Sequence, residues 1–224
     1  MDTKKLIIVG DSAFAEIAYE YFTYDSDYEV VAFSVEVSFL TRDTLFGLPI
    51  VAFEDIENIF PPDDHHFFVA TVYTQLNRLR TRLLHAAKTK GFTPASYISS
   101  RAFVWRNVEF GEHCFVFENN TVQPFVRIGD NVVLWSGNHI GHHSVVRDNC
   151  FFASQVVVSG FCDIGENSFL GVNATLAHNV VLGKNTWIGP GVTISKNTEP
   201  GALFGPPAAE PSRVSSLRFH KIKE

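Results

Sequence analysis

Apolar and polar positions along the first hundred residues follow two alternating periods. Short apolar runs occupy Leu6–Val9, Val30–Phe33 and Phe67–Ala70. The segments between and after them have apolar residues at helical spacing, over Ala13–Thr23, Phe53–Phe60 and Gln75–Lys90. Strands that alternate with helices form right-handed βαβ units, whose ligands bind at the carboxyl ends of parallel strands. The pattern therefore predicts a parallel α/β sheet that closes with Tyr97-Ile98, and it draws attention to the loop after Val9.

From residue 102 the pattern changes to a strict period of six. Every sixth position from Val104 to Ile194 is apolar, and the position two residues earlier is always small, β-branched or compact. A glycine often follows the apolar residue, which suits a turn with unusual backbone angles. This repeat is typical of a parallel β-helix in which three repeats close one coil. We expect about five coils, with residues of successive coils stacked on one another.

Composition narrows the class of protein. The chain has 224 residues, with Lys+Arg 18 against Asp+Glu 24 and a net charge of −6, which disfavours a nucleic-acid binder. No apolar run reaches the roughly 18 residues that span a bilayer, so we expect a cytoplasmic protein with no membrane partner. The three cysteines, Cys114, Cys150 and Cys162, all fall in the compact inward register, which predicts buried structural thiols.

Phenylalanine is unusually frequent, with 21 residues. Several aromatic side chains fall at outward positions of the β-helix: Phe115, Phe117, Phe125, Trp135 and Phe151. Exposed apolar side chains on the flat sides of a triangular prism require burial. We therefore predict a homotrimer, with these aromatics in a subunit interface or a ligand wall and the active sites between subunits.

Four segments carry a resemblance to a known family. They are Val9-Gly-Asp-Ser-Ala13, Ser136-Gly-Asn-His-Ile-Gly-His-His-Ser144, Ile188-Gly-Pro-Gly-Val-Thr-Ile-Ser-Lys196 and Leu203-Phe-Gly-Pro-Pro-Ala208. Together with the hexapeptide run they resemble the left-handed β-helix acyltransferases. The order of domains is similar to the nucleotide-sugar N-acetyltransferases and sialic acid O-acetyltransferases of bacterial surface-glycan synthesis. The resemblance implies a Rossmann-like nucleotide-sugar domain over residues 1–100, a left-handed β-helix over 101–197 and a tail over 198–224.

The resemblance implies an acetyl-CoA-dependent N-acyltransferase that acts on the amino group of a nucleotide-linked amino-deoxysugar. A sugar O-acetyltransferase of the sialic acid type is the main alternative, because one base serves both nucleophiles. A non-catalytic sugar-nucleotide binder is less favoured. A zinc hydratase on the same fold is also less favoured, because no third histidine follows His178, and no metal is expected. The sequence leaves the sugar, the nucleotide and the acyl chain open.

Acyl transfer needs a base whose pKa lies near neutrality and a hydrogen-bond donor to the oxyanion, and histidine is the natural base. The candidates are His139, His142, His143 and His178. His142 lies at an outward corner and occupies the position of the family's catalytic histidine, so it is the predicted base. Gly160 stacks above His142, and the resemblance implies that its N–H serves the thioester oxygen. We expect His139 to lie beside the substrate.

Two positions depart from the family. The residue after the catalytic histidine is usually acidic, whereas this chain has His143, so we expect Glu118 or Asn138 to supply the acceptor that orients His142. A position at which the family can place a histidine near the thioester corresponds here to Phe151.

The resemblance also implies binding residues. For acyl-CoA they are Gly160, Val172 and Pro190. For the sugar nucleotide they are Ser12, Ala13, Phe14, Glu36 and Gly47. Glu36 stands where the family tends to have aspartate, and Gly10-Asp-Ser-Ala-Phe14 lacks the full dinucleotide fingerprint, so a dehydrogenase is not expected.

Overall fold

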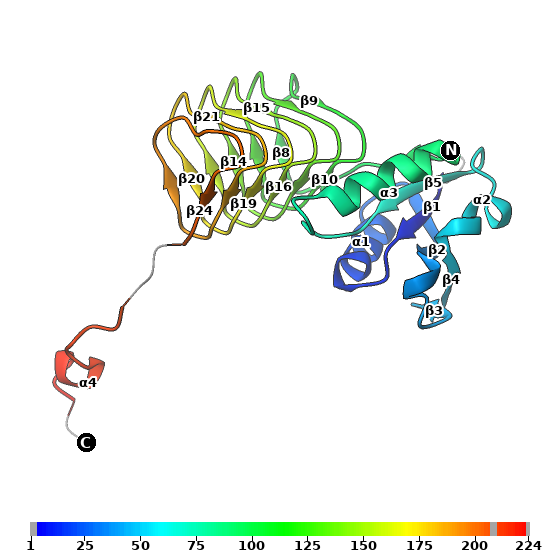
Figure 1. The fold of residues 1–224 in the computed structure, drawn as a ribbon, viewed down its shortest axis with the longest axis horizontal. Coiled ribbons are helices and arrows are strands. Elements are labelled where there is room, and N and C mark those ends of the chain that lie inside the picture. Colours follow the sequence, from blue (N-terminus) through cyan, green and yellow to red (C-terminus); the bar gives the residue numbers. More distant parts are fainter. Residues whose placement is uncertain (1–3, 207–209, 223–224) are drawn as a thin grey trace.

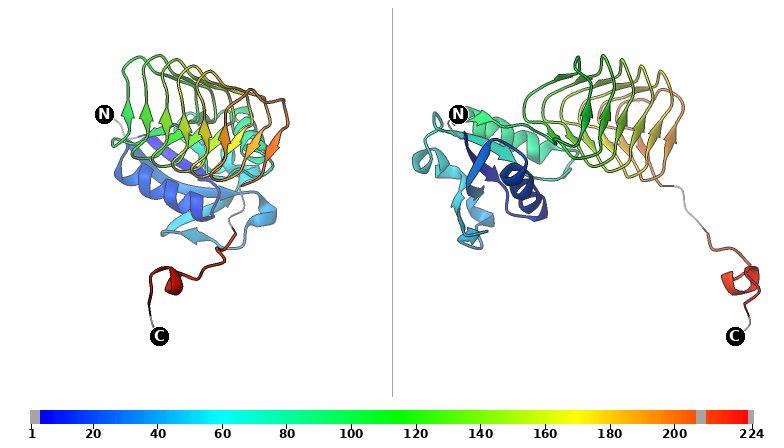
Figure 2. Two further views of the ribbon diagram at one scale, coloured as in Figure 1. Left: turned by 90° about the vertical axis from the view of Figure 1, so that its left-hand side faces the viewer. Right: turned by 180° about the vertical axis from the view of Figure 1, so that it is seen from behind.

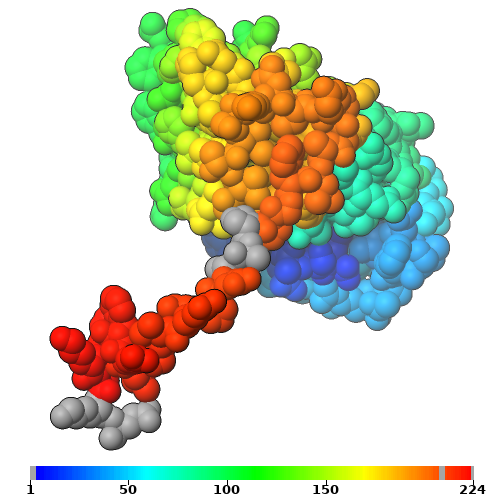
Figure 3. All heavy atoms as spheres, turned by 60° about the vertical axis from the view of Figure 1, so that its left-hand side comes forward, coloured from blue at the N-terminus to red at the C-terminus, as the bar shows by residue number. Residues whose placement is uncertain are grey.

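A computed structural model describes residues 4–206 and 210–222. Figure 1 shows an α/β domain at one side of a stack of coiled strands, and Figure 2 shows the same arrangement from two further sides. The segment that ends in α4, Ser216–Phe219, extends away from both (Figures 1 and 3). The part of the chain that positions functional groups is therefore residues 4–206.

The first domain is built on a sheet in the order β3-β4-β2-β1-β5-β6, in which all neighbours are parallel except β3 and β4. Its strands are β1 Lys4–Val9, β2 Tyr28–Val35, β3 Thr44–Leu45, β4 Leu48–Ala52, β5 His65–Val69 and β6 Thr93–Pro94. Its helices are α1 Ala13–Tyr24, η1 Val37–Phe39, η2 Phe53–Asp55, α2 Ile56–Ile59 and α3 Arg78–Thr89. The alternating strands and helices predicted from the sequence are present, and the hairpin of β3 with β4 is an additional feature at the edge.

Both faces of this sheet are covered, because alternate residues of β1 point to opposite sides. Leu6 and Ile8 belong to a cluster with the buried side of α1. Ile7 and Val9 belong to a second cluster with α2 and α3. The domain therefore has three layers, and the loop after β1 lies at the carboxyl edge of the sheet.

In the second domain the chain winds in successive coils, and the strands of these coils form three parallel sheets of seven, six and five strands. The first sheet has β7 Tyr97–Ile98, β10 Phe115–Val116, β13 Val133–Leu134, β16 Phe151–Phe152, β19 Phe169–Leu170, β22 Trp187–Ile188 and β24 Leu203–Phe204. The second sheet has β8 Phe103–Val104, β11 Thr121–Val122, β14 His139–Ile140, β17 Val157–Val158, β20 Thr175–Leu176 and β23 Thr193–Ile194. The third sheet has β9 Glu109–Phe110, β12 Arg127–Ile128, β15 Val145–Val146, β18 Asp163–Ile164 and β21 Val181–Leu182.

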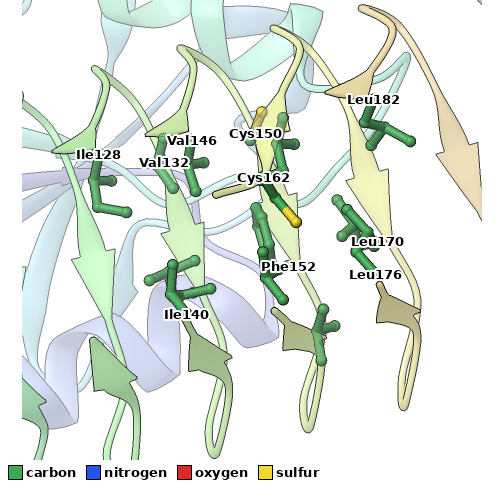
Figure 4. Close-up of a cluster of buried hydrophobic side chains, with 14 of the residues drawn as sticks. Ile128, Val132, Ile140, Val146, Cys150, Phe152, Cys162, Leu170, Leu176 and Leu182 are labelled. Carbon is green, nitrogen blue, oxygen red and sulfur yellow. The ribbon is translucent and has the colours of Figure 1, made fainter. Parts of the chain in front are cut away.

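The interior of the coils contains the apolar side chains of the six-residue repeat. Figure 4 shows how Ile128, Val146, Ile140 and Leu176 point into the space between the sheets. All three cysteines are free and buried there, as predicted, and burial raises the pKa of the Cys114 thiol to about 11.

The glycines of the repeat serve a different purpose from the one expected. Gly141 does not have a positive φ; a Cβ there would lie 2.6 Å from the backbone nitrogen of Gly160 in the next coil. The left-handed backbone falls two residues later at the corners, where Asn149 and Asn167 tolerate φ values of +60° and +55°. The glycines thus allow successive coils to approach closely.

The outward aromatics of the first sheet form the contact between the two domains. Phe115, Phe117 and Phe151 are no more than 2% exposed, and they share one apolar cluster with Phe14 and Phe22 of α1. The expected subunit interface is wrong for Phe115 and Phe117, because α1 of the same chain covers them. Phe151 instead packs 5.3 Å from Tyr73 and lines a cavity with Trp135, so the alternative of a ligand wall stays a prediction for these two rings. Phe125 differs, since it is 57% exposed at another corner.

The sequence pattern assigns Tyr97-Ile98 to the α/β sheet, and this assignment is wrong. β7 pairs in parallel with β10, so it opens the first coil of the β-helix, and β6 is the edge strand of the α/β sheet. The first coil therefore begins before the expected boundary at residue 100.

A fully buried arginine joins the two domains at the corner between the third and first sheets. Arg80 of α3 donates hydrogen bonds to the carbonyl oxygens of Val69 at 3.0 Å, Asn131 at 2.9 Å and His113 at 3.2 Å. Burial lowers the pKa of Arg80 to about 9, and burial followed by the Arg80 charge holds the pKa of His113 well below its usual value. His113 therefore stays neutral and accepts from the backbone N–H of Val69 at 2.8 Å.

Arg80→Ala is expected to destabilise the protein by about 3 kcal/mol, because it leaves buried carbonyl groups without donors. Arg82→Ala, two residues further along α3, is the matched control. The Arg82–Glu36 pair is largely exposed, and its loss is expected to cost less than about 1 kcal/mol. Urea unfolding of the two variants measures the difference, and equal destabilisation would contradict a structural role for Arg80 at the domain junction.

Candidate functional site

The predicted base lies at the corner between the second and third sheets, which we call the histidine corner (residues 123–125, 141–143, 159–161 and 177–179). His142 is half-buried, and its backbone N–H donates to the Gln123 side-chain oxygen at 2.9 Å. Its Nδ1 lies 3.1 Å from Nδ1 of His143. The rings of His142 and His178 are 6.4 Å apart, with Phe161 beside both. The histidine predicted as base therefore sits among aromatic rings on the outer surface.

Gly160 lies directly against this imidazole. A Cβ on Gly160 would meet Cε1, Nε2 and Nδ1 of His142 at 2.8, 2.9 and 3.2 Å. Among the described residues no acceptor takes the backbone N–H of Gly160. The corner thus brings together an imidazole and an unpaired backbone donor, which are the two groups that acyl transfer requires.

Gly160→Ala is expected to lower kcat for acyl transfer by about 10-fold or more, because the added methyl group displaces the His142 ring. Gly205→Ala is the control, since a Cβ there meets nothing within 4 Å. Steady-state kinetics with melting temperatures checks the pair. Unchanged kcat in Gly160→Ala would show that the position of the ring against Gly160 is unimportant.

His139 lies apart from this group. It is on β14, on the outer face of the second sheet, between Thr121 and Val157. Its side chain is half-buried, and that face is open to a partner or a ligand.

A cavity of about 170 Å³ lies at the carboxyl edge of the α/β sheet, and we call it the sheet-edge cavity. It is lined by Val9, Gly10, Asp11, Ser12, Ser34, Val35, Glu36, Phe39, Thr71, Leu79 and Leu83. Ser12 is the N-cap of α1, and its hydroxyl makes no capping hydrogen bond. The hydroxyls of Ser34 and Thr71 are buried and have no partner among the described residues. The cavity therefore combines a helix N-terminus with three hydroxyls that are not used by the fold.

Both carboxylates of this cavity are paired with arginines. Glu36 binds both guanidinium nitrogens of Arg82 at 2.8 Å, and these hydrogen bonds lower its pKa. Asp11 accepts from Arg42 at 3.2 Å. An anionic ligand at the helix N-terminus therefore meets carboxylates whose charge is already compensated.

Three residues of the predicted sugar-nucleotide set do not line this cavity. The Phe14 side chain is 2% exposed and packs 5.6 Å from Phe115 and 5.8 Å from Trp135, so its ring is a domain contact. Gly47 lies in the exposed β3–β4 hairpin, with φ of +76°, at the edge of the sheet. Ala13 is exposed at the start of α1.

Neither of the expected orienting residues reaches His142 within the chain. Glu118 is at the corner between the first and second sheets and accepts from the Tyr21 hydroxyl at 2.6 Å. Burial opposes ionisation of Glu118, but hydrogen bonds from Ser136 and Tyr21 outweigh it and lower its pKa. Asn138 is 1% exposed and accepts from the backbone N–H of Val156 at 2.8 Å, so it is a structural residue inside the coil.

The predicted acyl-CoA residues Val172 and Pro190 line a second cavity of about 370 Å³, which we call the aromatic cavity. Its other lining residues are Val72, Tyr73, Trp135, Phe151, Ala153, Ser154, Phe169, Gly171 and Trp187. Phe151 contributes a ring 5.3 Å from Tyr73. Sequence reasoning missed Tyr73, which lies in the loop after β5 and shows no periodic signal.

The histidine corner and the sheet-edge cavity lie on opposite sides of the β-helix. The α/β domain covers the first sheet, whereas the histidine corner joins the second and third sheets. A corner of a three-sided prism is remote from the opposite face. The sheet-edge cavity and His142 of one chain are therefore not brought together.

No group of three or more His, Cys, Asp or Glu side chains is arranged to hold a metal ion within residues 4–206 and 210–222. In the same part of the chain, no helix combines the length and the apolar character needed to cross a membrane.

Comparison with known proteins supports the fold. Residues 125–160 and 161–196 match the family model described as bacterial transferase hexapeptide (six repeats). No curated protein sequence matches the chain. The three parallel sheets and the hexapeptide repeat fit a left-handed β-helix.

Several solved structures share the arrangement of both domains. Perosamine N-acetyltransferase from Caulobacter crescentus, in complex with CoA and GDP-perosamine, is 24% identical, with a TM-score of 0.82 over 90% of this chain and 93% of that one. The acetyltransferase domain of PglB from Neisseria gonorrhoeae is 21% identical, with a TM-score of 0.81 over 93% and 100%. WeeI from Acinetobacter baumannii is 20% identical, with a TM-score of 0.71 over 88% and 94%. The resemblance to sugar acyltransferases of the left-handed β-helix type is thus confirmed for the fold.

Proposed function

We propose that this protein transfers an acetyl group from acetyl-CoA to the amino group of a nucleotide-linked amino-deoxysugar used in surface-glycan synthesis. The observation that carries the proposal is the contact between the His142 imidazole and Gly160, whose N–H is unpaired among the described residues. In the proposed reaction the neutral sugar amine attacks the thioester carbonyl, and His142 Nε2 takes the proton that the amine loses as the C–N bond forms. The C–S bond then breaks, and CoA leaves as the thiol with that proton. The Gly160 N–H donates to the thioester oxygen as the tetrahedral intermediate forms.

The sheet-edge cavity is the proposed nucleotide site. The N-terminus of α1 favours a diphosphate, and the hydroxyls of Ser12, Ser34 and Thr71 are available to a ribose or a phosphate. Compensation of Glu36 and Asp11 by arginines removes repulsion of that diphosphate. Perosamine N-acetyltransferase, which shares the fold, carries GDP-perosamine and CoA in its solved complex.

The acetyl-CoA site is proposed at the surface of the β-helix. Val172 and Pro190 offer exposed apolar contacts, and Gly160 allows a close approach to the backbone. Acetyl coenzyme A is bound in one solved structure of the PglB acetyltransferase domain, which has the same fold.

A second copy of the chain is needed to complete this site, because His142 and the sheet-edge cavity lie on opposite sides of one chain. We propose a homotrimer in which the histidine corner of one subunit faces the α/β domain of its neighbour. Exposed apolar side chains of the second and third sheets supply surface for that contact: Phe103, Phe125, Val157, Phe161 and Val181. Light scattering at micromolar concentration is expected to give three times the monomer mass, and a monomer would contradict the assembly.

The activity is tested with acetyl-CoA and a panel of UDP-, dTDP- and GDP-linked amino-deoxysugars, with release of the CoA thiol as readout. Matched nucleotide sugars with a hydroxyl in place of the amine, and a sialic acid, form the second arm. Thiol release that requires an amino sugar supports the proposal. Release with the hydroxyl sugars alone would assign the protein to the O-acetyltransferases.

A further inference from the structure

The residue that follows the proposed base is a histidine with an unusual partner. Nδ1 of His143 and Nδ1 of His142 are 3.1 Å apart, which is hydrogen-bond distance. Two imidazole nitrogens share such a bond only when one carries the proton and the other accepts it. Whether Nδ1 of one ring carries a proton therefore decides whether Nδ1 of the other does.

The His143 ring is held by its neighbours in the stack. It lies 4.8 Å from the Phe161 ring, with an angle of 12° between the planes, and 4.6 Å from the Phe125 ring, at 30°. All three residues have left-handed backbone, with φ of 59°, 60° and 65° for His143, Phe161 and Phe125. Stacking on both faces thus presents the edge of His143 to His142.

The plane of the His142 ring is perpendicular to this stack. The interplanar angle between His142 and His143 is 89°, and that between His142 and Phe161 is also 89°. On its other side the His142 ring rests against Gly160. The position of the ring is therefore set by Gly160 and by the hydrogen bond at Nδ1.

A histidine accepts a proton at Nε2 only when that nitrogen is free, so the neutral ring must carry its proton on Nδ1. This tautomer requires an acceptor facing Nδ1. Among the described residues no carboxylate is hydrogen-bonded to His142, and the partner present is Nδ1 of His143. His143 is exposed, so water can accept from its own Nε2–H.

We propose that His143 is the positioning residue of this site: neutral His143 accepts the Nδ1–H of His142 and leaves His142 Nε2 free to act as the base. The role of Nε2 as base rests on the proposed function, whereas the tautomer assignment does not. His143 thus takes the orienting role that was expected of Glu118 or Asn138, which the structure places elsewhere.

Two substitutions separate positioning from packing. His143→Phe keeps an aromatic ring between Phe125 and Phe161 but removes the acceptor nitrogen. His143→Asn loses the ring but keeps an acceptor, and asparagine tolerates the left-handed backbone that the same corner shows at Asn179, with φ of 62°. Light scattering and melting temperature identify any variant that fails to fold or assemble. The variant that does assemble is then compared with the wild type.

The first readout is the tautomer of His142 by ¹⁵N NMR of ring-labelled protein without substrate, with the resonance assigned by its loss in His142→Gln. The proton is expected on Nδ1 in the wild type and in His143→Asn, and on Nε2 to a substantial degree in His143→Phe. An Nε2–H tautomer in the wild type, or no change in His143→Phe, would overturn the proposal.

The second readout is kinetic. His143→Phe is expected to lower kcat by about 10- to 100-fold with little change in the KM for acetyl-CoA, and His143→Asn is expected to restore most of that loss. Equal losses in both folded variants would show a packing role and overturn the proposal. Absence of acyl transfer in the wild type would refute the proposed function alone, because the NMR result still decides the tautomer.

Discussion

His142→Ala is expected to lower kcat for acyl transfer by about 100-fold or more, because general-base catalysis typically supplies 10²–10⁴-fold. Binding of acetyl-CoA and the oligomeric mass are expected to stay nearly unchanged, since the side chain lies at an outer corner and not in the core. His139→Ala, on the outer face of β14, is expected to have a smaller effect. Stopped-assay kinetics with isothermal titration of acetyl-CoA measures both quantities.

The pH profile supplies a control for this prediction. A histidine base must be unprotonated to accept a proton, so kcat/KM is expected to fall on the acid side of the profile, and that limb is expected to disappear in His142→Ala. Near-normal kcat in the variant would mean that the amine binds already deprotonated and that the enzyme contributes proximity and oxyanion stabilisation.

Mixing His142→Ala with a second variant, Ser12→Trp, is expected to restore activity that each lacks alone. The reason is that each proposed site takes His142 from one subunit and the sheet-edge cavity from another. Ser12→Trp fills the cavity, and it costs little helix stability because the Ser12 hydroxyl makes no capping hydrogen bond. Each variant alone is expected to be inactive with the amino sugar. In randomly mixed trimers about a quarter of the sites combine an intact base with an intact cavity, so co-expression is expected to recover up to about 25% of wild-type activity.

Two affinity tags, one on each variant, verify that mixed assemblies form. Mixed trimers without activity would show that base and nucleotide site act within one chain. The ratio of the two variants can also be varied, and recovery is expected to be greatest at equal amounts.

The repeat made the β-helix predictable from the sequence, because its interior accepts one apolar side chain at every sixth residue regardless of the rest of the protein. The same period shows that Phe115 and Phe151 point outward but not what covers them. Phe115 is covered by α1, about a hundred residues earlier in the chain, whereas Phe151 is covered by Tyr73 of the loop after β5. The apolar face of α1 looks the same whether it packs on its own sheet alone or on a second domain as well. The period therefore left both a subunit interface and a ligand wall open for these rings, and the structure uses Phe115 and Phe117 to join the two domains.

The candidate site was predictable in part. The stacking of coils placed Gly160 above His142, which the contact between them confirms. Glu118 and Asn138 were chosen by residue type, although the period already places Asn138 in the inward compact register, where it is 1% exposed. The partner of His142 Nδ1 depends on the direction of one side chain at a left-handed corner, which no sequence pattern records.

The linkage in the reaction product decides whether the protein is a sugar N-acetyltransferase. The protein is incubated with acetyl-CoA and the nucleotide-linked amino-deoxysugar that gives the fastest thiol release, and the product is isolated and examined by mass spectrometry and NMR. We predict one acetyl group per molecule, attached to the sugar nitrogen as an amide that survives mild base, and formed about 100-fold or more slowly when His142 is replaced by alanine. An acetyl ester on a sugar hydroxyl, or CoA released while the sugar nucleotide is recovered unchanged, would contradict the account.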